Sequence, residues 1–310
     1  MKIYLNFNVK VLSLIASSTE IVHALGCGKN LVGRSHECDF PIEVKSLPHC
    51  TEPSFDVEGS SKEIDDRVKS TLQSALSVYK VDEAILADLD PDVIITQSQC
   101  EVCAVSLEDV ESAVELLSGS KPQIISLQPN SLSDIWNDIN MVSRGLDVEN
   151  RGIELVKTMK DKIQELNQSV KGVPLKTVAC IEWIDPLMAA GNWVPTLVEL
   201  AGGKNLFGEA GKHSPWMDFE TLKSKDPDVI VVMPCGYNIS KTIQEMKVLT
   251  DHLEWDSLSA VKEGRVYLTD GNQYFNRPGP RIVDSLEILI EILHEDKFDF
   301  SHHKSGWIKL

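Results

Sequence analysis

The sequence predicts an α/β fold of two Rossmann-like lobes, each with a mainly parallel sheet, joined by a long rigid α-helix. Three observations lead to this prediction. The chain has 310 residues, more than one hydrophobic core usually serves. Apolar runs typical of buried strands alternate with helical patterns in both halves, which indicates parallel sheets. The two halves also contain similar sequence elements in the same order.

The repeated elements are a helix end and the start of a strand. The first half has ALGCGKNLVG at 24–33, and the second half has ELAGGKNLFG at 199–208. DPDVI then occurs at 90–94 and again at 226–230. In each pair, glycine ends a helix and Pro-Asp introduces a strand. One match of this kind could be chance, but two in the same order indicate lobes of related build.

Hydrophobic patterns place the elements of each lobe. In the first lobe, residues 1–130, we expect strands at 10–16, 31–35, 92–97 and 123–127. The expected helices there are 18–25, 82–89 and 106–117, the first opened by a capping box of Ser17 and Glu20. In the second lobe, residues 173–310, we expect strands at 176–182, 228–234 and 265–269. Its expected helices are 195–201, 218–224 and 280–293, and its last residues read as a polar surface tail.

The connection between the lobes, residues 131–172, is helical by pattern. Gly145 and Asp147 interrupt it, and apolar residues then recur at helical spacing from 148 to 170. A helix of that length spans roughly 35 Å and contains none of the Gly/Ser-rich sequence of flexible linkers. We therefore expect a rigid strut, small lobe movements on binding, and a ligand cleft beyond the carboxyl ends of the strands.

Charge and hydropathy exclude several classes of protein. The chain has 30 basic and 47 acidic residues, a net charge of −17, so its surface repels nucleic acid and anionic lipids. The longest apolar runs are far below the roughly 20 residues that a membrane helix needs. The first residues read as a core strand, not as a secretory signal. We therefore expect a cytoplasmic protein, or a periplasmic or extracellular one if a signal segment is missing from this sequence.

Several motifs together resemble a known family. They are VLSLIASSTEIVHALG at 11–26, GRSHECDFP at 33–41, TQSQCEVCAVS at 96–106, MPCGY at 233–237 and RPGPRIVDSLEIL at 277–289. In these segments the chain resembles the helix-strut class of ABC-transporter solute-binding proteins, and within it the vitamin B12-binding-protein-like branch. The resemblance implies non-catalytic binding of a corrinoid such as cobalamin, or of a related bulky metal chelate, for uptake or intracellular carriage, with no required cofactor.

The resemblance also points to aromatic residues that would stack on the ligand. Trp216 lies in HSPWMDF at 213–219, and Tyr274, Phe275 and Arg277 lie in NQYFNRPGPRI at 272–282. A flat macrocycle with amide arms suits aromatic faces and a few polar donors. Core packing is the alternative interpretation of these aromatic residues.

Transport members of the class dock to arginines of a permease through one acidic residue on each lobe. Glu220 matches that pattern, and Glu83 is its counterpart with a slightly different spacing to the following proline. The resemblance therefore implies an ABC-transporter permease as a partner. The alternative is that both residues are solvated carboxylates at helix starts, where negative charge is favoured in any case.

The cysteines form a second set of candidates. Seven cysteines, an odd number, argue against a disulfide framework. Cys100 and Cys103 lie where a strand passes into a helix, and Cys235 follows the corresponding strand of the second lobe. These positions predict that the cysteines face the cleft. Packing is the expected role of the remaining cysteines outside the SHECD motif, which are Cys27, Cys50 and Cys180.

The segment SHECD adds three more candidates, His36, Glu37 and Cys38, on a loop that follows a first-lobe strand. All six residues are candidate ligand contacts. Thiolates and imidazole suit zinc, copper(I) or iron, and one of them could bind a corrinoid cobalt. The candidate metal ligands are His36, Cys100, Cys103 and Cys235. For the Cys100–Cys103 pair, a redox role and plain packing remain alternatives.

Enzymatic function has little support in the sequence. GCGKN at 26–30 lacks the nucleotide-binding glycine patterns and ends a helix instead of starting one. His36, Glu37 and Asp39 could support acid–base chemistry. A zinc or iron protein, or an enzyme that uses the Cys/His cluster on the same scaffold, therefore remains the alternative. We predict a monomeric, non-enzymatic binding protein with a small-molecule metal chelate as its ligand.

Overall fold

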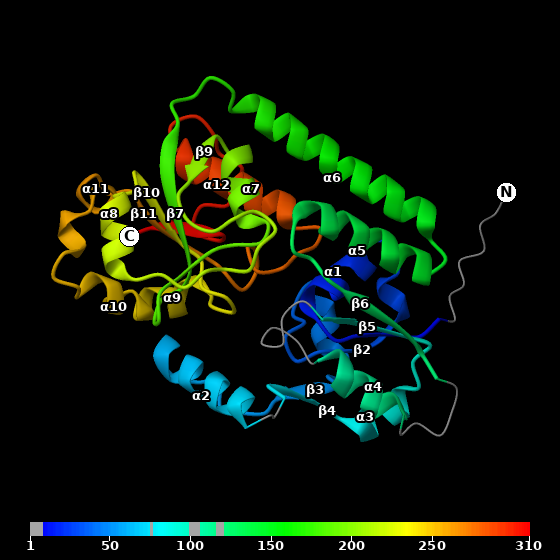
Figure 1. The fold of residues 1–310 in the computed structure, drawn as a ribbon. Coiled ribbons are helices and arrows are strands. Elements are labelled where there is room, and N and C mark those ends of the chain that lie inside the picture. Colours follow the sequence, from blue (N-terminus) through cyan, green and yellow to red (C-terminus); the bar gives the residue numbers. More distant parts are fainter. Residues whose placement is uncertain (1–8, 75–76, 99–105, 116–120) are drawn as a thin grey trace. The chain divides into compact units, whose positions relative to one another are not determined.

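The computed structural model describes residues 9–74, 77–98, 106–115 and 121–310, and the chain divides into two compact α/β units (Figure 1). Unit 1 comprises Met1–Glu58, Asp66–Pro129 and Ser133–Thr158, and unit 2 comprises Gly59–Asp65, Asn130–Leu132 and Met159–Leu310. The division falls within the 21-residue helix α6 (Glu149–Ser169). Two units with mainly parallel sheets confirm the predicted fold class.

Unit 1 is built on a parallel sheet with strand order β2-β1-β5-β6. Its strands are β1 (Val11–Ser13), β2 (Leu31–Arg34), β5 (Val93–Gln97) and β6 (Gln123–Leu127), which confirms the four predicted strands. The central strands β1 and β5 are buried along their whole length, as expected for a parallel sheet covered on both faces. A small antiparallel pair, β3 (Thr51–Pro53) with β4 (Tyr79–Val81), was not predicted, because three-residue strands carry almost no periodicity.

The described part of the chain before α6 also contains five helices and two 3-10 turns. They are α1 (Ala16–Ala24), α2 (Ser61–Gln73), α3 (Glu83–Leu89), α4 (Leu107–Glu115) and α5 (Leu132–Gly145), with 3-10 turns η1 (Gly28–Asn30) and η2 (Ile42–Ser46). Leu86 of α3 and Val110 of α4 pack with Leu12 and Ile94 of the sheet in one core cluster.

The predicted capping box at the start of α1 is wrong. The helix begins at Ala16 after the N-cap Ile15, which has no capping side chain, so Ser17 and Glu20 lie inside the helix. Contacts with the preceding strand accompany this earlier start. The Ser13 hydroxyl lies 2.6 Å from that of Ser18 and hydrogen-bonds to it.

Helices α5 and α6 follow the predicted interrupted pattern. Helix α5 ends at Gly145, Asp147 adopts a left-handed conformation with φ 55°, and α6 begins at Glu149. The two helices pack closely, because a Cβ atom built on Gly152 would lie 2.1 Å from the Ser143 hydroxyl oxygen. Only glycine fits this contact without a shift of the helices.

Unit 2 is built on a sheet with strand order β12-β11-β10-β7-β8, and β9 pairs with β7 off this path. The strands are β7 (Lys176–Trp183), β8 (Met188–Ala189), β9 (Gly203–Asn205), β10 (Val229–Val232), β11 (Val266–Thr269) and β12 (Trp307–Lys309). The three predicted strands correspond to β7, β10 and β11, which run parallel to one another.

Helices cover both faces of the unit 2 sheet, with α7 and α12 on one side and α8, α10 and α11 on the other (Figure 1). The helices are α7 (Val194–Leu200), α8 (Phe219–Lys225), α9 (Ile239–Glu245), α10 (Lys247–Thr250), α11 (Ser259–Lys262) and α12 (Ile282–Leu293), with the 3-10 turn η3 (Trp255–Ser257). Leu222, Leu249 and Ala260 pack against Ile230 and Leu268 of the sheet.

The last residues are not a polar surface tail. Residues 307–309 form β12, which pairs antiparallel with β11 and completes the sheet. The buried Glu291 of α12 accepts hydrogen bonds from the Trp307 indole and from the backbone N–H groups of Phe300 and His302. These contacts join positions that are far apart in the sequence. Composition does not reveal such contacts, and it therefore suggested a solvated segment.

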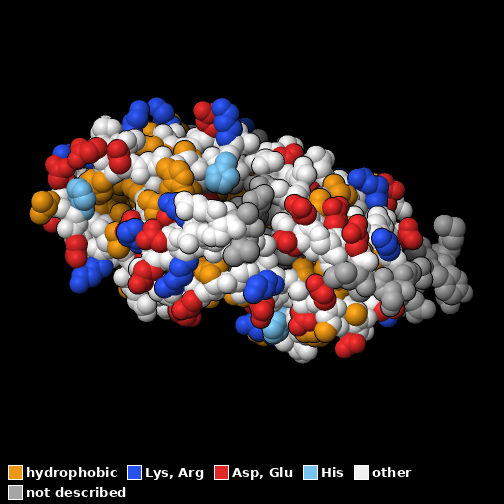
Figure 2. Space-filling model, turned by 60° about the horizontal axis from the view of Figure 1, so that its bottom comes forward, with side chains coloured by type: hydrophobic (Ala, Val, Ile, Leu, Met, Phe, Trp, Pro, Cys, Tyr) orange, Lys and Arg blue, Asp and Glu red, His pale blue; other side chains and the backbone are white. Residues whose placement is uncertain are grey.

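The surface agrees with the acidic composition. On the face shown in Figure 2, acidic and basic side chains are interspersed, and the basic ones do not gather into one patch. None of the helices in the described part of the chain is both long and apolar enough to cross a membrane.

Candidate functional site

The strongest candidate surface in each unit is the edge where the parallel strands end. In open α/β sheets, ligands bind beyond the carboxyl ends of the strands. In unit 1 the loop Ser35–Phe40 follows β2, and Ser98 and Gln128 follow β5 and β6. In unit 2 the segments after β7, β10 and β11 begin at Ile184, Met233 and Asp270.

His36 and Glu37 lie together on the loop after β2. The His36 Nδ1 atom lies 2.8 Å from the Thr51 hydroxyl oxygen, and its ring is 5.1 Å from the Tyr79 ring. Its Nε2 atom is 3.3 Å from a Glu37 carboxylate oxygen, an ion-pair distance without hydrogen-bond geometry. Both ring nitrogens therefore face protein groups, and a ligand would have to compete with them.

Arg34 holds the shape of this loop. Its guanidinium donates to the carbonyl groups of Ser35 at 3.0 Å, Cys38 at 3.2 Å and Leu47 at 3.2 Å. One side chain thus satisfies several backbone acceptors that turn away from the sheet. The loop that presents His36 and Glu37 is therefore fixed from within unit 1.

Cys38 does not face outward. Its side chain is fully buried, and its sulfur accepts a hydrogen bond from the Thr19 hydroxyl at 3.0 Å. Thr19 in turn lies 2.7 Å from the Ser13 hydroxyl oxygen. The Cys38 thiol therefore belongs to a buried cluster of small polar side chains between β1 and α1.

Cys100 and Cys103 lie outside the described residues. Within 9–74, 77–98, 106–115 and 121–310, no three His, Cys, Asp or Glu side chains gather closely enough to hold a metal ion. The described candidates His36, Cys38 and Cys235 thus form no metal-binding cluster of their own. Cys27, Cys50 and Cys180 are buried packing residues, as the sequence indicates. Burial raises the pKa of the Cys180 thiol to about 12, and the nearby Glu182 adds to the effect.

Cys235 is half-buried on the segment after β10. Its backbone N–H donates to the carbonyl of Glu182 at 3.1 Å, which joins the ends of β10 and β7. Beside it, the rings of Trp183 and Tyr237 lie 5.2 Å apart, and the Lys241 ammonium lies 5.3 Å from the Tyr237 ring centre. This edge of unit 2 therefore combines a thiol, two aromatic rings and a cation.

Tyr274, Phe275 and Arg277 follow β11, and their exposure differs. Phe275 is fully buried, and its carbonyl accepts a hydrogen bond from the Trp193 indole at 3.0 Å. Arg277 is only 4% exposed and donates to the Asn272 side chain at 3.1 Å. Tyr274 is half-buried, with the Arg281 guanidinium 5.4 Å from its ring centre. Of the three, Tyr274 has the most side chain available to a ligand.

Trp216 is an exposed large aromatic residue. Its side chain is 55% exposed, whereas its backbone is fixed by a bridge to Met188 of β8. The next residue, Met217, donates its N–H to the carbonyl of Leu187 at 2.9 Å. An exposed indole on a fixed backbone is suited to stacking on a flat ligand.

Glu83 and Glu220 lie in corresponding helices of the two units, but Glu83 directly follows its N-cap aspartate and Glu220 is the second residue after its own. Each is exposed in the first turn of a seven-residue helix, α3 or α8. An aspartate caps each helix through the N–H three residues on, Asp82 at 2.9 Å and Asp218 at 2.8 Å. Both helices also end in a left-handed aspartate. The repeated sequence thus produces the same local structure twice.

Trp183 and Tyr237 were not singled out from the sequence, although Tyr237 lies within the MPCGY motif. Their pairing depends on the parallel alignment of β7 and β10, which brings the ends of these strands together. The sequence did contain one indication of this site. Trp183 is an aromatic residue directly after a predicted strand and directly before the turn Ile184-Asp185-Pro186.

Two α/β units with aromatic and polar side chains at the carboxyl ends of their strands define a ligand-binding protein. The chain belongs to the periplasmic binding protein family, whose model matches residues 11–273. This result confirms the resemblance to the solute-binding proteins of ABC transporters and supports a solute-binding role.

Similar proteins agree with this assignment. Vitamin B12-binding protein of Vibrio vulnificus is 24% identical over 91% of this chain and 89% of its own length. The uncharacterized ABC transporter substrate-binding lipoprotein YvrC of Bacillus subtilis is 23% identical over 93% of this chain and 81% of its own. Among solved structures, a periplasmic heme binding protein from Pseudomonas aeruginosa has the same fold, with a TM-score of 0.69 at 18% identity, covering 94% of this chain and 95% of its own.

The expected cytoplasmic location is wrong. The family is that of periplasmic binding proteins, and the Bacillus relative is a lipoprotein of an ABC transporter. The expectation rested on the first residues alone, which carry less information about location than the family does.

Proposed function

We propose that the protein binds a bulky metal chelate, with a corrinoid of the cobalamin type as the first candidate, and delivers it to an ABC-transporter permease. The observation that carries the proposal is the aromatic and polar edge of unit 2, where the half-buried Trp183 indole and Cys235 lie beside the buried Tyr237 ring. Aromatic faces bind a flat macrocycle, and polar donors bind its amide arms. The B12-binding relative supports the corrinoid.

Haem is the second candidate ligand. The haem-binding structural neighbour supports it, as does the hydroxyl of Tyr237, which is buried and has no hydrogen-bond partner. Tyrosine is one of the axial ligands that haem iron accepts in proteins. Against this, burial raises the pKa of Tyr237, with further effects of Glu245 and Cys235, and this opposes formation of the phenolate. A corrinoid is therefore the better match.

The test is a titration of the reduced, purified protein with hydroxocobalamin and, separately, with haemin. Cobalamin should quench tryptophan fluorescence saturably at one equivalent. Trp216→Ala should weaken that binding by about tenfold through loss of a stacking contact, and Trp216→Phe should restore most of it. Leu253→Ala, at a fully exposed position of unit 2, serves as the matched control.

Further measurements distinguish the candidate ligands. A shift of the cobalt absorbance that is lost in Cys235→Ser or Cys100→Ser would identify a thiolate ligand. Saturable binding of haemin without binding of cobalamin would replace the first candidate by the second. Stoichiometric zinc or iron in the protein as isolated, with neither chelate bound, would contradict the proposal.

A further inference from the structure

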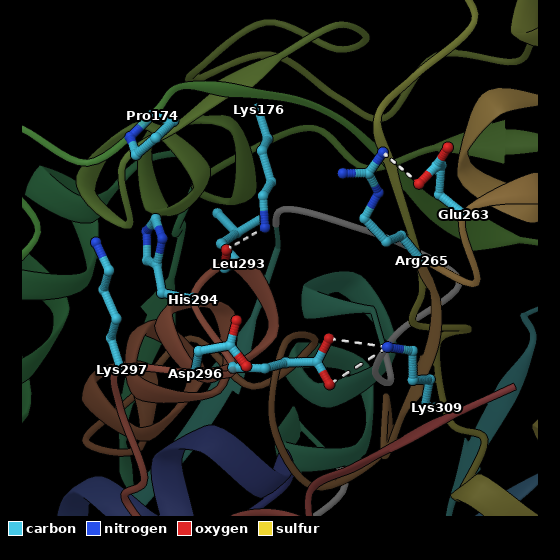
Figure 3. Close-up of a pocket in the computed structure, with 10 residues that line it drawn as sticks. Pro174, Lys176, Glu263, Arg265, Leu293, His294, Asp296, Lys297 and Lys309 are labelled. Atoms are coloured by element: carbon cyan, nitrogen blue, oxygen red, sulfur yellow. Dashed lines mark hydrogen bonds and ion pairs between the residues drawn. The ribbon is translucent and has the colours of Figure 1, made fainter.

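Unit 2 contains a polar pocket at the amino ends of its parallel strands, opposite the edge discussed above (Figure 3). Lys176 is the first residue of β7, and Arg265 directly precedes β11. The end of α12 contributes Leu293 and the residues that follow it. The pocket measures about 470 Å³, within the range of roughly 300–1,000 Å³ that small-molecule sites occupy.

Part of the charge in this pocket is already neutralised. The Lys309 ammonium lies 3.1 Å from a Glu295 carboxylate oxygen and 3.5 Å from the other. Glu295 also accepts a hydrogen bond from the Tyr267 hydroxyl. Lys309 and Glu295 thus balance one another and leave little charge for a ligand.

Arg265 and Lys176 are not balanced in this way. The only carboxylate in ion-pair range of Arg265 among the described residues is that of the exposed Glu263, 3.9 Å from Nη2. The Nε atom of Arg265 is buried and has no hydrogen-bond partner. Lys176 donates to a neutral acceptor, the carbonyl of Leu293, at 2.6 Å, which leaves two of its three N–H groups for another partner.

Lys176 and Arg265 line the same pocket, and their positive charges oppose each other there. Burial lowers the pKa of Lys176, and the positive charge of Arg265 lowers it further, against weaker opposing effects of Glu295, Asp296 and Asp228. A buried guanidinium N–H without an acceptor is costly in free energy. An anion bound to both side chains would accept hydrogen bonds from the Lys176 ammonium and the Arg265 guanidinium and relieve the repulsion.

We propose that this pocket binds a small phosphate monoester, with its phosphate group on Arg265 and Lys176. The two cations that line this pocket match the charge of a phosphate dianion, and the pocket is larger than phosphate alone requires. In Figure 3 the Asp296 carboxylate lies across the pocket from both cations. Negative charge there would repel a second anionic group, so the remainder of the ligand is uncharged or cationic and faces Asp296.

The experiment is calorimetric titration of the full chain with inorganic phosphate and with glycerol phosphate, at an ionic strength held constant with sodium chloride. Both should bind saturably. Arg265→Gln and Lys176→Met should each weaken binding at least about tenfold, since each removes a charge-assisted hydrogen bond. Lys247→Met, at an exposed lysine of α10 in the same unit, should leave binding unchanged.

Two more measurements distinguish loss of phosphate binding from misfolding of a variant and from failure of the proposed function. Asp296→Asn should tighten phosphate binding, because it removes the opposing charge and keeps both cations. Titration with hydroxocobalamin should give the same affinity in Arg265→Gln as in the original protein. The proposal is overturned if the original protein shows no saturable phosphate binding at constant ionic strength, or if Lys247→Met weakens it as much as Arg265→Gln does.

Discussion

At the scale of single residues, Asp138 on α5 has an unusual environment. It is 3% exposed, one carboxylate oxygen accepts the Gln128 N–H at 3.4 Å, and the other oxygen has no partner. Burial raises its pKa to about 7, against the Gln128 hydrogen bond and with a small addition from Asp134. The group is therefore protonated in the folded chain over a pH range in which it is ionised in the unfolded chain.

The sign of the resulting pH dependence follows from proton binding. Between roughly pH 4 and pH 7 the folded state binds the extra proton, so the free energy of unfolding falls as pH rises and levels off above about 7. Asp138→Asn cannot ionise. From pH 5 to pH 8 its stability relative to the original protein should rise by up to about 3 kcal/mol, measured by urea unfolding.

The control is Asp251→Asn, which changes an exposed carboxyl group in unit 2. It should show no comparable rise. A constant difference between Asp138→Asn and the original protein at both pH values would mean that Asp138 is already ionised in the folded chain at pH 5.

At the scale of elements, Glu291 of α12 holds the last strand, β12, against the helix through hydrogen bonds. Its buried carboxylate serves three donors, the Trp307 indole and two backbone N–H groups. Glu291→Leu should lower the free energy of unfolding by roughly 3 kcal/mol or more, because all three donors lose their acceptor. Urea unfolding measures the loss, and amide hydrogen exchange of β12 should accelerate with it.

Glu287 provides the comparison one turn earlier on the same helix. One of its carboxylate oxygens lies 3.0 Å from Nε2 of the His302 ring. Glu287→Leu should therefore cost about 1 kcal/mol. Equal losses in the two variants would show that Glu291 does not hold β12 as described.

At the scale of the whole molecule, each unit presents an exposed glutamate in the first turn of a corresponding helix, Glu83 in α3 and Glu220 in α8. As part of the proposed function, these carboxylates dock to arginines of the permease. The double variant Glu83→Gln/Glu220→Gln should keep its affinity for the chelate. It should lose most of its stimulation of permease ATPase activity in proteoliposomes, by about tenfold or more.

Glu43→Gln/Glu199→Gln is the matched control, with one exposed glutamate changed in each unit. It should stimulate the permease normally. If both double variants stimulate the permease equally well, Glu83 and Glu220 have no special part in docking.

The predictable part of this molecule is the part with strong local patterns. The buried strands β1, β5, β7 and β10 and the long helix α6 were found because hydrophobic periodicity is local. Helix α2 was missed because its sequence, SKEIDDRVKSTLQ, is mostly polar and buries only Ser61 and Asp65. The candidate site could be predicted in part. The segments that follow strands can be located from the sequence, but the exposure of their side chains cannot.

The fold class, the repeated α3 and α8 helices and the family follow from the amino-acid sequence, because each depends on patterns within short segments. Which side chains reach the surface depends on how the elements pack in three dimensions. Cys38 is buried in a hydroxyl cluster, whereas Trp216 is exposed. Lys176 and Arg265 meet in one pocket because β7 and β11 flank β10 in the sheet. Such contacts depend on strand order and burial, which no short segment encodes.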